Sequence, residues 1–199
     1  MAIDGLGSAA IQGANLQNMD IETLLLSVQS ERARLMDEQL INQVNEVKAR
    51  NNQIAKLNNA LSALNSAAAM CSSDGKKSID SDSNFKKDNY ALEREVNTAL
   101  IDAGITDPKL SKNDDGGGGL TNSGGARLKG GLRGDVKKPA LDALITTVKG
   151  QIDQLNNSNQ MDMLRLQSLT NKRNEAFDVM TNFIKKAQDS RSAIIGNMR

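Results

Sequence analysis

The sequence contains no histidine and no tryptophan, and its 199 residues include a single cysteine, Cys71. Without histidine, the usual zinc-ligand sets and the commonest proton-transfer side chain are missing. One cysteine cannot form an intrachain disulfide, and without a histidine partner Cys71 is better explained as a small buried residue than as a nucleophile. Paired carboxylates in a recognisable catalytic context are also missing. The sequence therefore predicts neither an enzyme nor a protein with a metal or other cofactor.

Aromatic side chains make up only 2% of the sequence, and apolar residues make up 38%. This composition is poor material for a thick globular core and favours long helices packed along narrow seams. The chain lacks a run of about eighteen apolar residues, so we do not expect an integral membrane protein. Its 25 basic and 24 acidic side chains are scattered along the sequence. We therefore expect no electrostatic attraction of nucleic acid.

The strongest pattern is a heptad stripe in residues 139–199. Only an α-helix places such positions on one face, and a repeat near 3.5 residues is typical of a coiled-coil seam. Pro139 stands where a helix can begin, because its missing N–H would be unsatisfied there anyway. Counted from Leu141 in steps of four and three, the stations are Leu141, Ile145, Val148, Ile152, Leu155, Asn159, Asp162, Leu166, Leu169, Arg173, Ala176, Met180, Phe183, Ala187, Ser190 and Ile194.

Among the polar stations of this stripe are Asn159, Asp162 and Arg173. Such residues can fix the register of a coiled coil, or the helix can rotate slightly so that the charges stay in water. For Asp162 we expect the rotation, with Met163 taking its place on the seam. Both interpretations remain open for Asn159 and Arg173.

A partner helix is predicted at residues 19–70. Asp20 can cap its N-terminus, and Met19 and Leu24 can form a hydrophobic staple. Between Val47 and Ile54, the intermediate seam position falls on Arg50 or Asn51. Either choice gives two successive steps of three residues, which predicts a local stammer in the coiled coil. The predicted seam positions of this helix are Leu40, Val44, Val47, Ile54, Leu57, Leu61 and Leu64.

Residues 71–138 differ in character from both helices and are interpreted as an insertion between them. A short amphipathic helix is predicted over residues 88–103, ended by Gly104 in the left-handed conformation and by Pro108. Nine of the sixteen glycines fall within residues 111–135. They do not form a phosphate-binding loop, because Gly124-Gly125 is followed by Ala126-Arg127 instead of Lys-Ser or Lys-Thr.

The predicted fold is therefore all-α. A long two-helix antiparallel coiled-coil hairpin is formed by residues 19–70 and 139–199, residues 71–138 form a Gly-rich insertion with a short helix, and residues 1–18 form a flexible N-terminus. One seam does not account for every apolar position of the C-terminal helix, and the short helix is too short to cover the others. We predict a subunit interface at these surplus positions: Leu164, Phe177, Ile184, Ile195 and Met198.

Two blocks of the sequence resemble a known family. The first runs from Met19-Asp20-Ile21-Glu22-Thr23-Leu24-Leu25-Leu26 into Glu31-Arg32-Ala33-Arg34-Leu35. The second comprises Ala176-Phe177-Asp178-Val179-Met180-Thr181-Asn182-Phe183-Ile184-Lys185-Lys186 and the ending Ser192-Ala193-Ile194-Ile195-Gly196-Asn197-Met198-Arg199. With the long terminal helices and a polar middle, these blocks resemble the extracellular filament and needle-tip proteins of bacterial type III secretion systems, especially EspA-like filament subunits.

This resemblance covers about 110 residues, excludes residues 71–138, and is one of architecture more than of a strict motif. It implies a secreted, self-assembling subunit at the bacterial cell surface that forms a hollow conduit or scaffold for effectors, with residues 71–138 as a variable, outward-facing insertion. The implied partners are further copies of the chain, the needle subunit, translocator proteins and a dedicated cytoplasmic chaperone before export. Residues 1–18 would act as an uncleaved secretion signal, since the start of the chain lacks the features of a cleavable one.

A second hypothesis requires no secretion. A soluble helical hairpin could act as an adaptor or chaperone that binds a partner's amphipathic helix through the surplus apolar face. Such a protein would remain monomeric or dimeric, whereas a filament subunit would polymerise. Placing charges at Phe183 and Ile194 is expected to abolish polymerisation.

Overall fold

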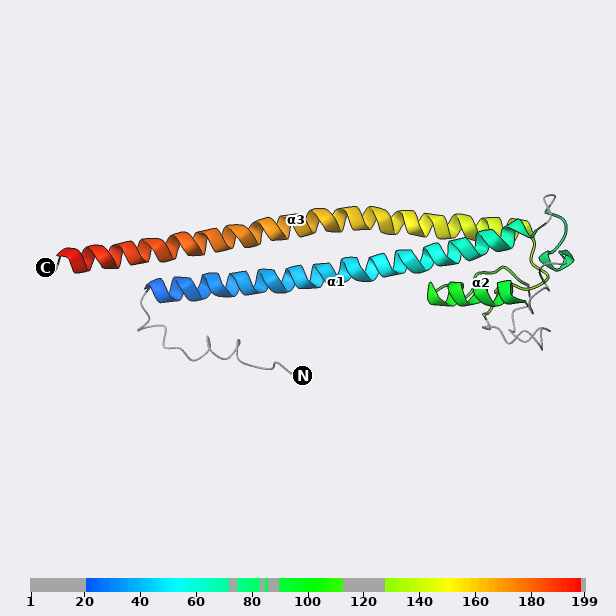
Figure 1. Ribbon diagram of the computed structural model, residues 1–199, viewed down its shortest axis with the longest axis horizontal. Coiled ribbons are helices and arrows are strands. Elements are labelled where there is room, and N and C mark those ends of the chain that lie inside the picture. The colour runs from blue at the N-terminus through cyan, green and yellow to red at the C-terminus, as the bar shows by residue number, and fades with distance from the viewer. Residues whose placement is uncertain (1–20, 72–74, 83–84, 86–89, 113–127, 198–199) are drawn as a thin grey trace. The chain divides into compact units, whose positions relative to one another are not determined.

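The computed structural model of the chain describes residues 21–71, 75–82, 85, 90–112 and 128–197. Its helices are α1 (Ile21–Ala69), a short 3₁₀ turn (Ile79–Ser81), α2 (Ala91–Asp102) and α3 (Lys138–Asn197). In this described part the protein is all-α, and α3 packs against α1 (Figure 1). The predicted cap at Asp20, the N-terminal segment 1–18 and the glycines at 116–119 and 124–125 lie outside the described residues.

Two compact units divide the chain between them. The terminal unit contains α1 up to Val44 and α3 from Met163 onward. The core unit contains residues 45–162. Both long helices contribute a segment to each unit. Interior glycine is rare in them, so their continuity agrees with the helix propensity of their sequences.

The core unit contains one cluster of buried apolar side chains. The C-terminal half of α1 provides Leu57 and Leu64, α2 provides Val96 and Leu100, and α3 provides Leu141. Figure 1 shows α2 beside this half of α1, and the Nε2 of Gln53 on α1 donates to the carbonyl oxygen of Ala103 at 2.8 Å. The core is therefore built from three helices and not from a single two-helix seam.

The described part of the predicted insertion belongs to this core. Ile79, Phe85, Leu110, Leu128, Leu132 and Val136 are all buried in the same cluster as the helices. Residues 78–80 pair with residues 134–137: an isolated antiparallel bridge joins Ser78 to Lys137, and the N–H of Ile79 donates to the carbonyl oxygen of Val136 at 2.8 Å. The connection after α1 and the connection before α3 thus fasten each other against the helices.

The predicted end of the short helix is confirmed. Gly104 has φ of +78°, which suits glycine, and its N–H donates to the carbonyl oxygen of Ile101 at 2.9 Å. The N–H of Ile105 reaches back to the carbonyl oxygen of Leu100, also at 2.9 Å. These two bonds form a Schellman motif, which satisfies carbonyls that the helix leaves unpaired. Leu100 is fully buried, so the turn holds α2 in the core.

Candidate interaction surface and the polar positions of the seam

The stripe of α3 is turned inward along most of its length. Leu141, Ile145, Val148 and Ile152 are buried, whereas Leu155, Leu166, Leu169, Met180 and Phe183 are half-buried. Ala176 is buried as well. The side chain of Ile194 lies outside the described residues. The heptad pattern therefore identified the inward face of this helix from Leu141 to Phe183.

The predicted stripe of α1 requires one correction. Leu57 and Leu64 are buried, and Leu40, Val47, Ile54 and Leu61 are half-buried. Val44, however, is 51% exposed, whereas its neighbour Gln43 is only 6% exposed. With Gln43 as the station, the steps from Leu40 through Gln43, Val47, Arg50 and Ile54 alternate regularly, so the predicted stammer does not occur. The apolar pattern favoured Val44 as the seam position, but the helix keeps its regular heptad spacing and buries the side-chain amide of Gln43 instead.

The expected rotation of α3 at Asp162 was also wrong. Asp162 is 7% exposed, whereas Met163, predicted to replace it, is 52% exposed. The carboxylate of Asp162 forms an ion pair with the guanidinium of Arg50, at a station of the α1 seam. A charged side chain can be buried when an opposite charge compensates for its lost hydration. Arg50 therefore keeps Asp162 on the seam.

The two undecided stations of α3 also face polar partners on α1. In the core unit, the Nδ2 of Asn159 donates to the Oδ1 of Asn51 at 2.6 Å. In the terminal unit, Arg173 forms an ion pair with Asp37, and its guanidinium lies 5.1 Å from the centroid of the Phe177 ring. Polar pairs at these positions favour one register, because a shift of either helix would separate the partners.

Reversing the charge of one partner in the seam should therefore destabilise the protein, and reversing both should restore most of the loss. We expect Asp162→Arg to lower the free energy of unfolding by about 3 kcal/mol, because it buries two cations together. Adding Arg50→Asp should recover most of this loss. Chemical denaturation of the three proteins measures the effect, with Arg165→Asp at an exposed position of α3 as the control. A double variant no more stable than Asp162→Arg would show that the pair does not set the register.

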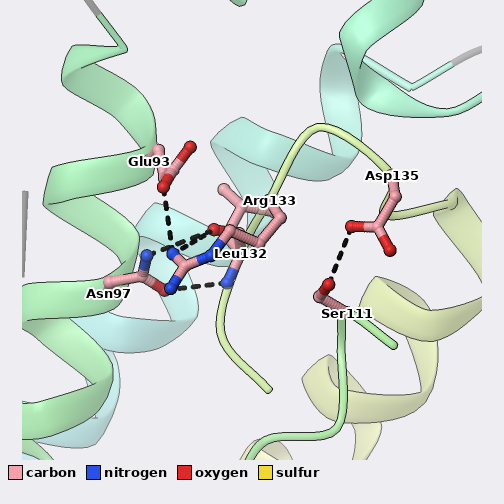
Figure 2. A network of polar contacts seen from close by, with 6 residues as sticks. All are labelled: Glu93, Asn97, Ser111, Leu132, Arg133 and Asp135. Carbon is pink, nitrogen blue, oxygen red and sulfur yellow. Dashed lines mark hydrogen bonds and ion pairs between the residues drawn. The ribbon is translucent and has the colours of Figure 1, made fainter. Parts of the chain in front are cut away.

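A second polar cluster holds residues 128–136 against α2 (Figure 2). The side chain of Asn97 makes two hydrogen bonds with the backbone of Leu132: its Nδ2 donates to the carbonyl oxygen at 3.2 Å, and its Oδ1 accepts from the N–H at 2.7 Å. Both groups are buried, so these bonds replace the hydrogen bonds lost to water. Gly131 is required beside them, because a Cβ there would collide with the Oδ1 of Asn97.

Glu93 and Arg133 form the charged part of this cluster. The Nη1 of Arg133 donates to the Oε1 of Glu93 at 3.0 Å and to the carbonyl oxygen of Leu132 at 3.2 Å. Among the described residues, the Oε2 of Glu93 is buried without a hydrogen-bond partner. Burial raises the pKa of the Glu93 carboxyl above its ordinary value, although Arg133 and Arg94 act in the opposite direction. Loss of hydration therefore outweighs the attraction to the arginines.

The direction of this pKa shift predicts a pH dependence of stability. Because the folded protein binds the Glu93 proton more tightly than the unfolded chain, Glu93 contributes most to stability below the ordinary carboxyl pKa of 4.5. That contribution is lost as the pH rises through the higher pKa of the folded protein. We expect Glu93→Gln to remove this part of the pH dependence. Thermal unfolding of both proteins from pH 4 upward tests it, and parallel curves would contradict the assignment.

Cys71 fits the expectation of a small buried residue. It is buried at the end of α1, and its Sγ lies 3.6 Å from the carbonyl oxygen of Ala67. Burial raises the pKa of its thiol, which favours the unreactive protonated form. No group of three or more histidine, cysteine, aspartate or glutamate side chains suited to a metal ion occurs among the described residues.

The predicted subunit-interface positions are exposed or half-exposed where the structure describes them. Leu164, Ile184 and Ile195 are exposed, Phe177 is half-buried, and Met198 lies outside the described residues. Met163, Phe177 and Ile184 are separated by multiples of seven residues, so they follow one line along α3 beside its buried stripe. Met163 was expected on the seam, so the apolar pattern of the sequence does not reveal it as a member of this second row.

Exposed apolar side chains are concentrated in the terminal unit. Of the twelve large ones in the described chain, ten belong to that unit and two, Ile101 and Met161, to the core unit. The ten are Leu25, Val28, Leu35, Ile41, Val44, Met163, Leu164, Val179, Ile184 and Ile195. The terminal unit therefore leaves more of its large apolar side chains in water than the core unit does.

No protein-family model, curated protein or solved structure matches this chain. Within the part of the chain that the structure describes, none of the helices has a stretch long and apolar enough to cross a membrane.

Proposed function

We propose that the protein is a self-assembling subunit of an extracellular filament or needle tip of a type III secretion system. The observation that supports this most is the placement of ten of the twelve exposed large apolar side chains in the terminal unit. Burying such side chains against further copies of the chain would remove them from water, which is the main favourable term in protein association. The resemblance of the sequence to EspA-like filament subunits suggests the class of assembly.

The proposed subunit is an antiparallel coiled-coil hairpin of α1 and α3. Two polar contacts within the core unit support the antiparallel direction: Arg50 pairs with Asp162, and Asn51, one residue further along α1, pairs with Asn159, three residues earlier on α3. The glycine-rich segment would then form an outward-facing insertion between the helices, next to the packed residues of the core unit.

Assembly of this kind implies a particular set of partners. The subunit would contact further copies of itself, the needle subunit and translocator proteins outside the cell. Before export, a dedicated cytoplasmic chaperone would cover the exposed apolar positions of α3. The assembled filament would act as a hollow conduit or scaffold for the delivery of effectors to host cells.

Electron microscopy of the purified full chain over a range of concentrations near neutral pH tests the proposal. Filaments or closed oligomers of uniform geometry are the expected result, accompanied by a concentration-dependent increase of mass in light scattering. A protein that stays monomeric or dimeric at the highest concentration would refute self-assembly. That outcome would favour a helical adaptor or chaperone that binds a partner's amphipathic helix through the same surface.

A further inference from the structure

The two units differ sharply in how much apolar surface they bury. Of the 22 buried apolar side chains in the described chain, 20 belong to the core unit. The two that belong to the terminal unit are Ala33 and Ala176, each of which buries a single methyl group. Because hydrophobic stabilisation grows with the apolar area removed from water, the terminal unit has far less of it than the core unit.

Polar groups weaken the terminal unit further. Gln43 is buried on its seam, and within the described residues the Nε2 of Gln43 has no hydrogen-bond partner. The Oε1 of Gln29 is likewise buried and unpaired. A buried polar atom without a partner loses its hydration without compensation. The Asp37–Arg173 ion pair cannot offset this loss, because both side chains are about two-fifths exposed and such pairs contribute little.

The core unit also contains buried polar atoms without a hydrogen-bond partner among the described residues, such as the Oε2 of Glu93, but its much larger apolar cluster outweighs their cost. Its buried charges form ion pairs, Arg50 with Asp162 and Glu93 with Arg133, and the side chain of Asn97 satisfies both backbone groups of Leu132. These contacts join α1 to α3, and α2 to the segment before α3. Opening any one of these elements would therefore expose the apolar cluster and break at least one of these polar contacts.

We infer that the terminal unit opens and closes separately from a core unit that stays folded. Local opening of the less stable part of a protein is expected when few apolar side chains are buried in that part. In the free subunit, the helical segments 21–44 and 163–197 separate and re-form repeatedly while residues 45–162 retain their structure. The terminal unit then becomes stable when its exposed apolar positions are covered by a partner, so that folding of this unit and association are coupled.

The second part of this inference rests on the proposed function, because it takes further copies of the chain as the covering partner. The first part does not, since it concerns the isolated subunit. Coupling of this kind would keep the free subunit from presenting one rigid, complete interface. It would also make association depend on the ordering of both helical segments.

Hydrogen exchange measured by mass spectrometry on the dilute full chain tests the first part. We expect the backbone amides of residues 24–44 and 163–195 to exchange at least about tenfold faster than the buried amides of α1, α2 and α3 in the core unit. The exchange rates of the two units should differ although the amides of both units lie in continuous helices. Equal protection of the two units, lost in one cooperative step, would overturn the inference.

A pair of neighbouring substitutions on α1 sharpens the test. Gln43→Leu replaces the buried amide by an apolar side chain and should slow exchange in the terminal unit by about tenfold, without changing exchange in the core unit. Val44→Leu adds apolar volume at an exposed position and should change the exchange rate of neither the terminal unit nor the core unit. A Gln43→Leu variant that slows exchange in both units equally, or in neither, would show that they do not open separately.

Exchange in the assembled state tests the coupling. Amides of residues 163–195 should become protected in filaments, while those of the core unit change little. If filaments form but the terminal unit exchanges equally fast in the free and assembled states, the coupling is wrong and the proposed function stands. If the dilute chain shows two levels of protection but never assembles, separate opening stands and the proposed function is wrong.

Discussion

Replacing Arg133 by methionine should lower the free energy of unfolding by about 3 kcal/mol, because it leaves the Glu93 carboxyl buried without its partner. Methionine retains much of the apolar volume of the arginine stem, so the loss arises mainly from the unpaired carboxyl. The raised pKa of Glu93 limits the loss, since the group can take up a proton instead of remaining charged. Chemical denaturation at neutral pH measures the change.

A second variant separates charge burial from packing. Removing both charges with Glu93→Leu and Arg133→Met should restore the stability to within about 1 kcal/mol of the original protein, because apolar pairs often replace buried ion pairs without loss. Lys149→Met, at an exposed position of α3, serves as the control and should change stability by no more than about 0.5 kcal/mol. If the double variant is as unstable as Arg133→Met, the arginine stabilises the core by its shape and not by its charge.

Periodicity was sufficient to find the long helices and the inward face of α3. Ile145, Val148 and Ile152 are buried where the heptad count placed them, because an apolar stripe of this length has one consistent helical solution. The short helix was found as well, since Gly104 and Pro108 mark its end by local backbone chemistry. These features depend on residues that are close together in the sequence.

The errors lie where a polar residue is buried. Heptad analysis preferred Val44 to Gln43 and Met163 to Asp162, because it assigns buried positions to apolar side chains. In the structure, Asp162 is paired with Arg50, more than a hundred residues earlier in the chain. A partner so distant cannot be identified from local periodicity, although polar residues at heptad stations on both helices signalled that such pairs were possible.

The core residues between the long helices could not be predicted for a related reason. Ile79, Phe85 and Val136 lie in connections without regular periodicity, yet all three are almost fully buried. Their position depends on non-local contacts such as the hydrogen bonds between Asn97 and Leu132, 35 residues apart. The sequence of these segments shows that they lack a helical pattern, but it does not show that they pack onto the helices.

The largest expected effect on assembly comes from the second apolar row of α3. Replacing both Met163 and Ile184 by aspartate should abolish polymerisation at concentrations where the original protein forms filaments. Each exposed side chain, if buried at an interface, contributes about 1.5–3 kcal/mol. Loss of two such contributions would raise the concentration needed for assembly more than about a hundredfold, and buried carboxylates would raise it further.

A control with the same change in charge shows whether position or charge is responsible. Ser168→Asp combined with Asn182→Asp also places two carboxylates on exposed positions of α3, but at polar sites away from the row. This control should assemble as the original protein does. Electron microscopy and light scattering compare the three proteins, and thermal unfolding of the core unit should be the same in all of them, because none of the four positions belongs to its core. Equal loss of assembly in both double variants would mean that added negative charge, and not the apolar row, prevents association.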